Sequence, residues 1–378
     1  MTILIYFLIF ASFLDTHAQM PILSPWAASL GATPFLIGLI IGSYSLFNIL
    51  GNLWAGIVID SRGFHKPLAL SLAGITLVVF SYAFLSSPLE ILLLRSVHGL
   101  LGGFLIPSTL GALNTLGSSS KRFSFYGICI GLAALTGPLL TGFLAGFFSF
   151  QLAYLGLALA LLPAALISIS LKFPEPPKEQ TGHIAPLEKI KLLIARPVLR
   201  SSFFFAFALM GATGTMMLFL PLRLEVLGIS SATTGLYFAL FALSTIITLA
   251  LWPLIFPRVR EEKILIISGL FISLFSISFL PFVSQVILGI CILGYGVGFG
   301  LVFPSLIRLI NSAPDPHFGS ATGVFFAFYS AGVVGVPPLA AFIWDLTGIF
   351  PTITAVILGI VSTITGFLSI KKRPISNL

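Results

Sequence analysis

The feature that most constrains this chain is a series of long apolar stretches separated by short turns that carry charge, Gly or Pro. A helix needs about 20 apolar residues to cross the hydrocarbon core of a bilayer. The sequence therefore predicts an all-α membrane protein with twelve transmembrane helices. The predicted spans are residues 3–28, 34–59, 67–85, 89–116, 123–147, 151–171, 201–226, 232–256, 264–283, 285–309, 319–344 and 351–370.

Composition supports this class and excludes others. The chain of 378 residues is 57% hydrophobic and 8% charged, whereas charged residues make up about a quarter of a soluble globular domain. The net charge of +8 does not predict nucleic-acid binding, because the cations lie beside the spans. Cys129 and Cys291 both fall inside predicted spans and are interpreted as packing residues, not as a disulfide or metal pair.

The spans fall into two groups of six. We expect an N-terminal six-helix bundle at residues 1–172, a cytoplasmic linker at 173–200, and a C-terminal six-helix bundle with a short tail at 201–378. Residues 187–195 of the linker alternate apolar and charged positions. They are interpreted either as a short amphipathic helix on the inner leaflet or as a solvated connector.

The placement of cations predicts the orientation. Of the 19 Lys and Arg residues, all but Arg95 and Arg223 fall on one side of the predicted spans. Lys and Arg are retained on the cytoplasmic side of a membrane. We therefore expect a multi-pass protein of the cell (plasma or inner) membrane with both termini in the cytoplasm.

The start of the chain has a second interpretation. Residues 3–14 followed by Thr16-His17-Ala18 resemble a signal peptide with its cleavage site. Two observations oppose it, because no basic residue precedes the apolar stretch and residues 20–30 continue it.

Polar residues inside the first span are the main functional candidates. Asp15 lies near the middle of that span, where a lone charge costs about 2.5–3.5 kcal/mol. Gln19 follows four residues later and shares its helix face, whereas His17 points elsewhere. We interpret Asp15 as a proton carrier; the alternative is a neutral carboxyl that only packs.

Three motifs carry a resemblance to a known family. The turn after the second span reads Gly56-x-x-x-Asp60-x-Arg62-Gly63 with Lys66 close behind. The fourth span contains Arg95 followed by His98 and Gly99, and the fifth contains Gly137-Pro138 with Gly142. Together they resemble the signatures of the major facilitator superfamily of secondary transporters.

The chain departs from these signatures at several positions. Ser61 stands where a basic residue usually follows the Asp, and His98 stands where the family usually has Gln. Ala133 and Thr141 occupy places in the fifth span where Gly is common.

The resemblance implies two parallel six-helix bundles that work by alternating access, most similar to the proton-coupled efflux antiporters. Asp60 and its neighbours would form a gating loop, and Gly137, Pro138 and Gly142 a helix kink. Arg95 would act with Asp15 in proton coupling; its alternative is an arginine that extends to the outer interface. The runner-up function is proton-coupled uptake of a sugar, acid or other metabolite. A third is a membrane sensor without transport.

The candidates for lining a substrate cavity are polar or aromatic residues of the spans: His17, Gln19, Asn48, Asn52, His98, Tyr237, Tyr295, Phe325 and Tyr329. The sequence contains no catalytic constellation, metal-ligand spacing or phosphate-binding loop. It therefore predicts a monomeric protein that is not an enzyme and uses no cofactor or metal. The expected partners are a small-molecule substrate, protons and the lipid bilayer.

Overall fold

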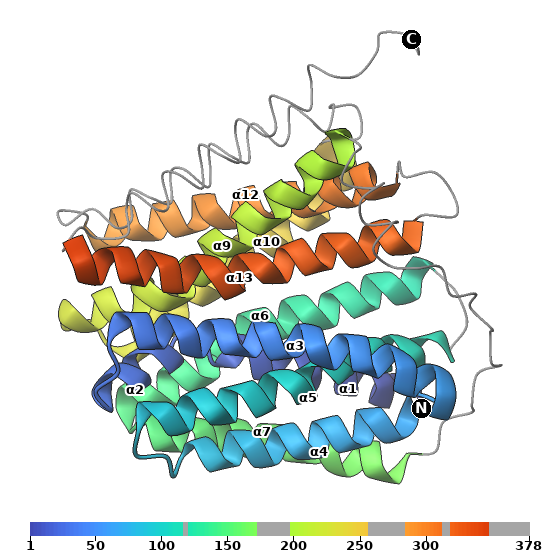
Figure 1. Cartoon of the computed structure of the whole chain (residues 1–378), viewed down its shortest axis with the longest axis horizontal. Helices are drawn as coiled ribbons and strands as arrows, with labels where there is room; N and C mark the ends of the chain where they lie inside the picture. The colour runs from blue at the N-terminus through green and yellow to red at the C-terminus, as the bar shows by residue number, and fades with distance from the viewer. Residues whose placement is uncertain (116–119, 172–196, 256–283, 312–317, 348–378) are drawn as a thin grey trace, which may run out of the picture. The chain divides into compact units, whose positions relative to one another are not determined.

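Figure 1 shows the computed structural model, which describes residues 1–115, 120–171, 197–255, 284–311 and 318–347. Their contacts divide the chain into two compact units. The first is Met1–Gln180 with Met217–Ala239, and the second is Thr181–Met216 with Leu240–Leu378. The three-part domain division stays a prediction.

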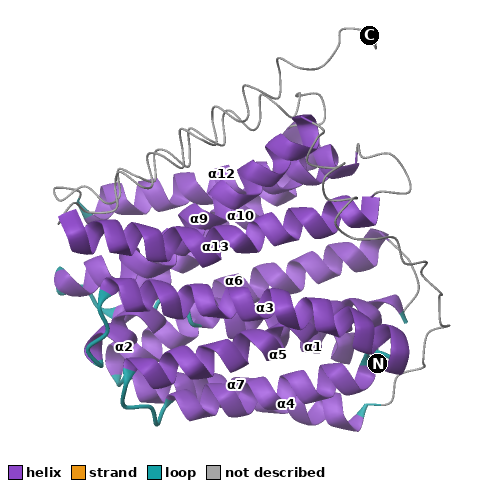
Figure 2. Ribbon diagram, in the orientation of Figure 1, coloured by secondary structure: helices purple, strands orange, loops and turns teal. Residues whose placement is uncertain are grey.

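In the described ranges every regular element is a helix, as Figure 2 shows. The first unit contains α1 (Thr2–Ala18), α2 (Leu23–Ser29), α3 (Pro34–Arg62), α4 (His65–Tyr82), α5 (Pro88–Asn114), α6 (Ser120–Phe147) and α7 (Phe150–Ser170). The helices α9 (Pro197–Val226) and α10 (Ser231–Ile255) are divided between the units, and α12 (Gln285–Asn311) and α13 (Phe318–Thr347) belong to the second.

Among the described residues nine helices are long and apolar enough to cross a membrane, and α1 with α2 makes a tenth span if the bent pair is counted as one. These ten match ten of the predicted spans. The other two, residues 264–283 and 351–370, lie outside the described residues, as does the predicted amphipathic helix at 187–195. The predicted all-α membrane class is confirmed.

Residues at the helix ends explain where several spans begin and stop. Thr33 and Ser149 accept hydrogen bonds from backbone N–H groups in the first turns of α3 and α7. Ser87 and Glu90 form a reciprocal capping box at the start of α5. Gly63 ends α3 with a φ of 76°, a backbone conformation that favours glycine.

The first span corrects one expectation, because residues 3–28 are not a single helix. α1 ends at Ala18, α2 begins at Leu23, and the two are bent by 45°. Pro21 lies in the break and has no N–H to donate to the carbonyl of His17. The N–H of Met20 donates to that carbonyl instead, at 3.2 Å.

In the first unit α1 is the central helix, packed against α5, α6 and α7, while α3 packs on α5 and α4 on α7. Its buried face includes Ile5, Leu8 and Ile9, each at most 1% exposed. The outer faces carry exposed apolar side chains such as Leu70 at 71% and Leu159 at 69%. Exposed leucine at that level is expected of a helix that faces lipid.

Candidate functional site

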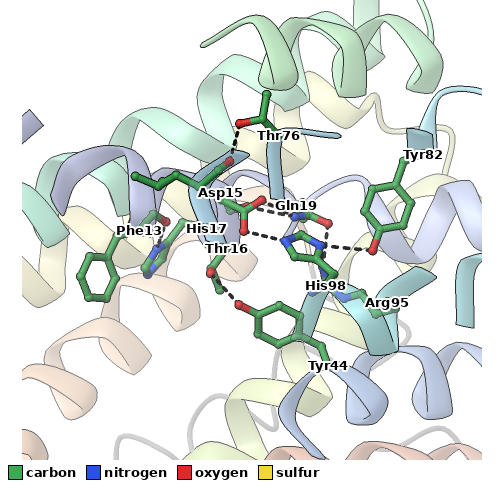
Figure 3. A network of polar contacts seen from close by, with 11 residues as sticks. Phe13, Asp15, Thr16, His17, Gln19, Tyr44, Thr76, Tyr82, Arg95 and His98 are labelled. Carbon is green, nitrogen blue, oxygen red and sulfur yellow. Dashed lines mark hydrogen bonds and ion pairs between the residues drawn. The ribbon is translucent and has the colours of Figure 1, made fainter. Parts of the chain in front are cut away.

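A buried contact between a carboxyl group and an imidazole joins α1 to α5. The Nε2 atom of His98 is 2.8 Å from Oδ2 of Asp15, and the two side chains are 0% and 1% exposed (Figure 3). Asp15 sits one turn before the end of α1, so the break that follows places it beside irregular backbone. A charge taken out of water needs a partner and hydrogen bonds for its other polar atoms.

Gln19 and His98 bridge Asp15 to Arg95. Gln19 donates from Nε2 to Asp15 Oδ1 at 2.9 Å, and its Oε1 accepts from Arg95 Nη1 at 2.7 Å. Arg95 Nη1 also lies 3.5 Å from Nδ1 of His98. Among the described side chains Arg95 forms no ion pair with Asp15, so the predicted partners meet through two intermediaries. Arg95 is 2% exposed, which contradicts the alternative of an arginine at the outer interface.

Aromatic rings enclose the cluster. The guanidinium carbon of Arg95 lies 4.4 Å from the ring centroid of Tyr44, a cation–π contact. The hydroxyl of Tyr82 is 3.2 Å from Nδ1 of His98. Trp26 of α2 and Tyr154 of α7 pack on Tyr82 with ring centroids 6.0 and 4.9 Å away. The rings separate the charges from lipid and water and so strengthen the interactions between them.

A cavity borders this cluster within the first unit. A water-sized molecule can occupy about 40 Å³ of it. Three helices line it: Ser12, Phe13 and Thr16 come from α1, Tyr44 and Asn48 from α3, and Gly102, Leu105 and Ile106 from α5. The lining combines hydroxyl and amide groups with apolar side chains. Tyr44 forms its wall toward Arg95 and meets Thr16 through hydroxyl groups 3.3 Å apart.

The motif of the fifth span packs against the break in the first. A Cβ atom at Gly137 would lie 2.9 Å from the backbone nitrogen of Ala18, so only glycine permits this approach. The hydroxyl of Thr141 donates to the carbonyl oxygen of Ala18. Pro138 lies inside α6 and Gly142 is buried. The motif thus borders the end of α1, next to Gln19.

The predicted gating loop is mostly the last two turns of α3. Gly56, Asp60 and Arg62 are helical, Gly63 ends the helix, and α4 already begins at His65. Arg62 and Lys66 are exposed. A cation in the last turn of a helix is favourable because it faces the negative end of the helix dipole.

The remaining cavity candidates are not gathered at the cluster. Nδ1 of His17 is 2.8 Å from the carbonyl oxygen of Phe13 on its own helix, and Asn52 donates to Asn48 at 2.9 Å. Tyr237 is 6% exposed in α10. The last three belong to the second unit: Tyr295 is buried in α12, and Phe325 and Tyr329 lie in α13 with ring centroids 6.1 Å apart.

The family can be decided from the whole chain. A sequence profile described as the Major Facilitator Superfamily matches residues 5–337. The chain belongs to this superfamily. As a superfamily member it is a multi-pass membrane transporter and not an enzyme, and its expected fold class is confirmed.

Two curated relatives of this superfamily member have names that refer to drugs. A multi-drug resistance efflux pump PmrA homolog from Lactococcus lactis is 30% identical over 128 residues, which span 33% of this chain and 32% of that protein. The quinolone resistance protein NorA from Staphylococcus aureus is 23% identical over 363 residues, 90% of this chain and 89% of NorA.

The fold also matches solved superfamily structures. The crystal structure of a variant of the nucleoside transporter NupG aligns with a TM-score of 0.82 at 15% identity, over 98% of this chain and 99% of that one. At this identity the likeness shows the fold alone.

Sequence reasoning missed Tyr44 and Tyr82, which contact the cluster directly in this superfamily member. Tyr44 lies four residues before Asn48 and so on the same helix face, which was a usable signal. Tyr82 carried no such signal, since tyrosine occurs in several spans. In the described part of the chain no group of His, Cys, Asp and Glu has the arrangement of a metal site.

Proposed function

We propose that this transporter is a proton-coupled exporter of small, largely apolar molecules that works in the cell membrane as an antiporter. In this proposal Asp15 and Arg95 belong to the proton-coupling site, and the cavity of the first unit contributes to the substrate site. The protein acts as a monomer, with both termini and the 173–200 linker in the cytoplasm. Asp60 and Arg62 affect the conformational cycle without touching substrate.

One observation is the main support for proton coupling. The carboxyl group of Asp15 and the guanidinium of Arg95 are both buried inside membrane spans. They are connected only through the side chains of Gln19 and His98. Ionisable groups at membrane depth are costly, and they occur where ions or protons move. A purely structural pair would gain most from direct contact between the two charges.

Tyr44 supports coupling between the proton site and the substrate. The guanidinium carbon of Arg95 lies 4.4 Å from the centroid of the Tyr44 ring, and Tyr44 also lines the cavity. A ligand that displaces Tyr44 changes the environment of Arg95, and a movement of Arg95 changes the shape of the cavity. The space that a water-sized molecule can occupy in this cavity is about 40 Å³, well below the roughly 300 Å³ of small-molecule pockets, so in this proposal the cavity enlarges when substrate binds.

The lining and the relatives favour export of an amphipathic compound. Phe13, Leu105 and Ile106 supply an apolar surface, while Asn48 and Thr16 supply a few polar groups. The two relatives named above are called an efflux pump and a resistance protein. The alternative direction, proton-coupled uptake of a metabolite, is separated from export by the experiment below.

The test uses purified protein in proteoliposomes with an imposed pH gradient. Ethidium and a fluoroquinolone serve as probes, and a dye in the lumen reports pH. An antiporter is expected to accumulate the probe in an acidic lumen and to release protons as it does so. A symporter would accumulate the probe only when the external solution is the acidic one.

The variant that tests the site is Asp15→Asn. It removes the carboxylate at nearly constant volume, so it is expected to abolish accumulation driven by the pH gradient and to retain probe exchange down its own gradient. Asp345→Asn is the matched control, because it makes the same change at an exposed carboxylate in α13. Full gradient-driven accumulation in Asp15→Asn would refute the proposed coupling site.

A further inference from the structure

His98 is the residue where all parts of the buried cluster meet. Its Nε2 faces Asp15 at 2.8 Å, and its Nδ1 faces both the Tyr82 hydroxyl at 3.2 Å and Arg95 Nη1 at 3.5 Å. The side chain is 0% exposed. Imidazole gains and loses a proton near neutral pH, and the position is one of the chain's own departures from the superfamily motif.

The hydrogen bonds around His98 fit one protonation state. Gln19 donates to Asp15 and accepts from Arg95, which suits an ionised Asp15 and a charged Arg95. A neutral imidazole with its hydrogen on Nε2 then donates to the second carboxylate oxygen. Its Nδ1 is left as an acceptor for the hydroxyl of Tyr82 or for Arg95. In this state every contact pairs a donor with an acceptor, and the charges of Asp15 and Arg95 cancel.

Adding a proton to Nδ1 disturbs this arrangement at one contact. The new Nδ1–H faces Arg95 Nη1, which is also a donor and carries a positive charge. Two cations within hydrogen-bond range repel strongly in a buried site. The Tyr82 hydroxyl can accept the new hydrogen, but Arg95 must then move away from His98. Arg95 is also the residue stacked on Tyr44, the wall of the cavity.

We propose that His98 is the group that takes up the transported proton, and that its protonation displaces Arg95 and so reshapes the cavity through Tyr44. This proposal rests on the proposed proton-coupled transport and assigns the proton to a particular atom. The proton binds the Nδ1 lone pair from one side of the membrane and leaves the same atom toward the other, with no covalent bond changed elsewhere.

Several helices contribute the groups that surround His98. The titratable or charged groups that face it come from four helices: Asp15 of α1, Tyr44 of α3, Tyr82 of α4 and Arg95 of its own helix α5. Behind Tyr82 lie Trp26 of α2 and Tyr154 of α7. Among these groups Asp15 has the only carboxyl group, and it faces Nε2, so Nδ1 is the atom that takes up the proton in this proposal.

The decisive variant is His98→Gln. A glutamine amide can donate to Asp15 and accept from Arg95, so the hydrogen-bonded ring is retained, but an amide binds no proton near neutral pH. A gradient of one pH unit sustains about a tenfold probe accumulation for each proton exchanged. We expect this accumulation to fall to about onefold in His98→Gln, and the dependence of exchange rate on pH to flatten between about pH 6 and 8.

The outcomes separate this inference from the proposed function. Loss of coupling in Asp15→Asn together with a wild-type pH profile and proton release in His98→Gln would overturn the role of His98 and keep the coupling. Full coupling in both variants would overturn both proposals. His98→Asn serves as the control for size, because it also lacks a titratable group and should reproduce the loss of coupling.

A spectroscopic measurement tests the inference if His98→Gln does not fold. The other four histidines, His17, His65, His183 and His317, are replaced, so that ¹⁵N nuclear magnetic resonance reports His98 alone. We expect the neutral form with hydrogen on Nε2 at high pH and a doubly protonated ring at low pH. A ring whose protonation state stays constant between about pH 5.5 and 8.5 would contradict the proposal.

Discussion

The first and fourth spans contact one another in each half, but the side chains at the two contacts differ in chemistry. In the first unit α1 and α5, the first and fourth spans, meet at the hydrogen bond between Asp15 and His98. In the second unit α9 and α12, the first and fourth spans of that half, meet where the hydroxyls of Thr213 and Tyr295 lie 2.7 Å apart. Tyr295 follows His98 by 197 residues, the spacing that also separates Gly38 near the start of α3 from Gly235 near the start of α10, so the two residues hold corresponding places in the two halves.

Under the proposed role of His98, this difference confines the response to protons to one of the two contacts. The hydroxyls of Thr213 and Tyr295 stay neutral near pH 7, whereas imidazole is the side-chain group suited to binding a proton in that range. In that proposal a proton alters the contact of α1 with α5 and leaves the contact of α9 with α12 unchanged.

The largest expected effect comes from removing one of the two buried charges of the first unit. Asp15→Leu leaves the charge of Arg95 buried without an anion, and such a change costs about 3–5 kcal/mol. The equivalent change in the second half, Thr213→Val, removes two neutral hydrogen bonds, to the hydroxyl of Tyr295 and to the carbonyl of Leu209, each worth about 0.5–1.5 kcal/mol. Chemical unfolding of both variants in the same detergent measures the two costs.

The double variant Asp15→Leu with Arg95→Leu sharpens this test. It removes both charges, so it is expected to recover much of the stability that Asp15→Leu loses, because no unpaired ion stays buried. If Asp15→Leu costs no more than Thr213→Val, the two contacts are energetically alike and the comparison fails.

Much of the fold followed from the sequence because spans have a strong signal. Each needs a long apolar stretch, and the ten spans within the described residues lie where these stretches predict them. The break after Ala18 was missed although Pro21 marked it, because the apolar run continues on both sides of the proline. Hydrophobicity reports membrane depth and not helix continuity.

The sequence predicted which residues belong to the site, but not which of them contact one another. Asp15, Gln19, Arg95 and His98 were each candidates, since polar residues at membrane depth are costly. The sequence favoured Asp15 with Arg95, yet the partner of Asp15 is His98. Arg95 and His98 lie three positions apart on α5. The rotation of α5 relative to α1 decides which of them contacts Asp15, and the spacing of residues along one helix does not predict that rotation.

A second comparison concerns close packing around the first span of each half. A Cβ atom at Gly137 of α6 would meet backbone atoms of Ala18, whereas one at Gly211 of α9 would lie 2.6 Å from a side-chain methyl of Val336 in α13. Both Gly137→Ala and Gly211→Ala are expected to cost about 1–3 kcal/mol through overpacking. Only the second clash can be relieved by trimming a side chain.

We therefore expect a second substitution to restore stability in the second half and not in the first. Val336→Ala should remove most of the cost of Gly211→Ala, because the clashing methyl groups are gone. Ala18→Gly should not remove the cost of Gly137→Ala, because the backbone nitrogen of residue 18 stays in place. Thermal unfolding of the four single and two double variants measures both cycles. Equal rescue in the two halves would show that the backbone at the break can move.

The smallest expected effect concerns the hydroxyl of Thr141, which donates to the carbonyl of Ala18 at the end of α1. Thr141→Val keeps the shape and removes this bond, so it should cost about 1 kcal/mol, and Thr141→Ser should restore most of it. When Gly137-Pro138 is aligned with Val336-Pro337, Ala340 of the second half takes the place of Thr141, and α9 runs unbroken from Pro197 to Val226. The carbonyls inside a continuous helix already accept backbone N–H groups, so a hydroxyl that bonds to one, as Thr213 does to Leu209 in α9, adds little net stability. Ala340→Ser should consequently give no gain in unfolding free energy. A gain there equal to the loss in Thr141→Val would mean that the hydroxyl packs favourably in either half and does not depend on the break.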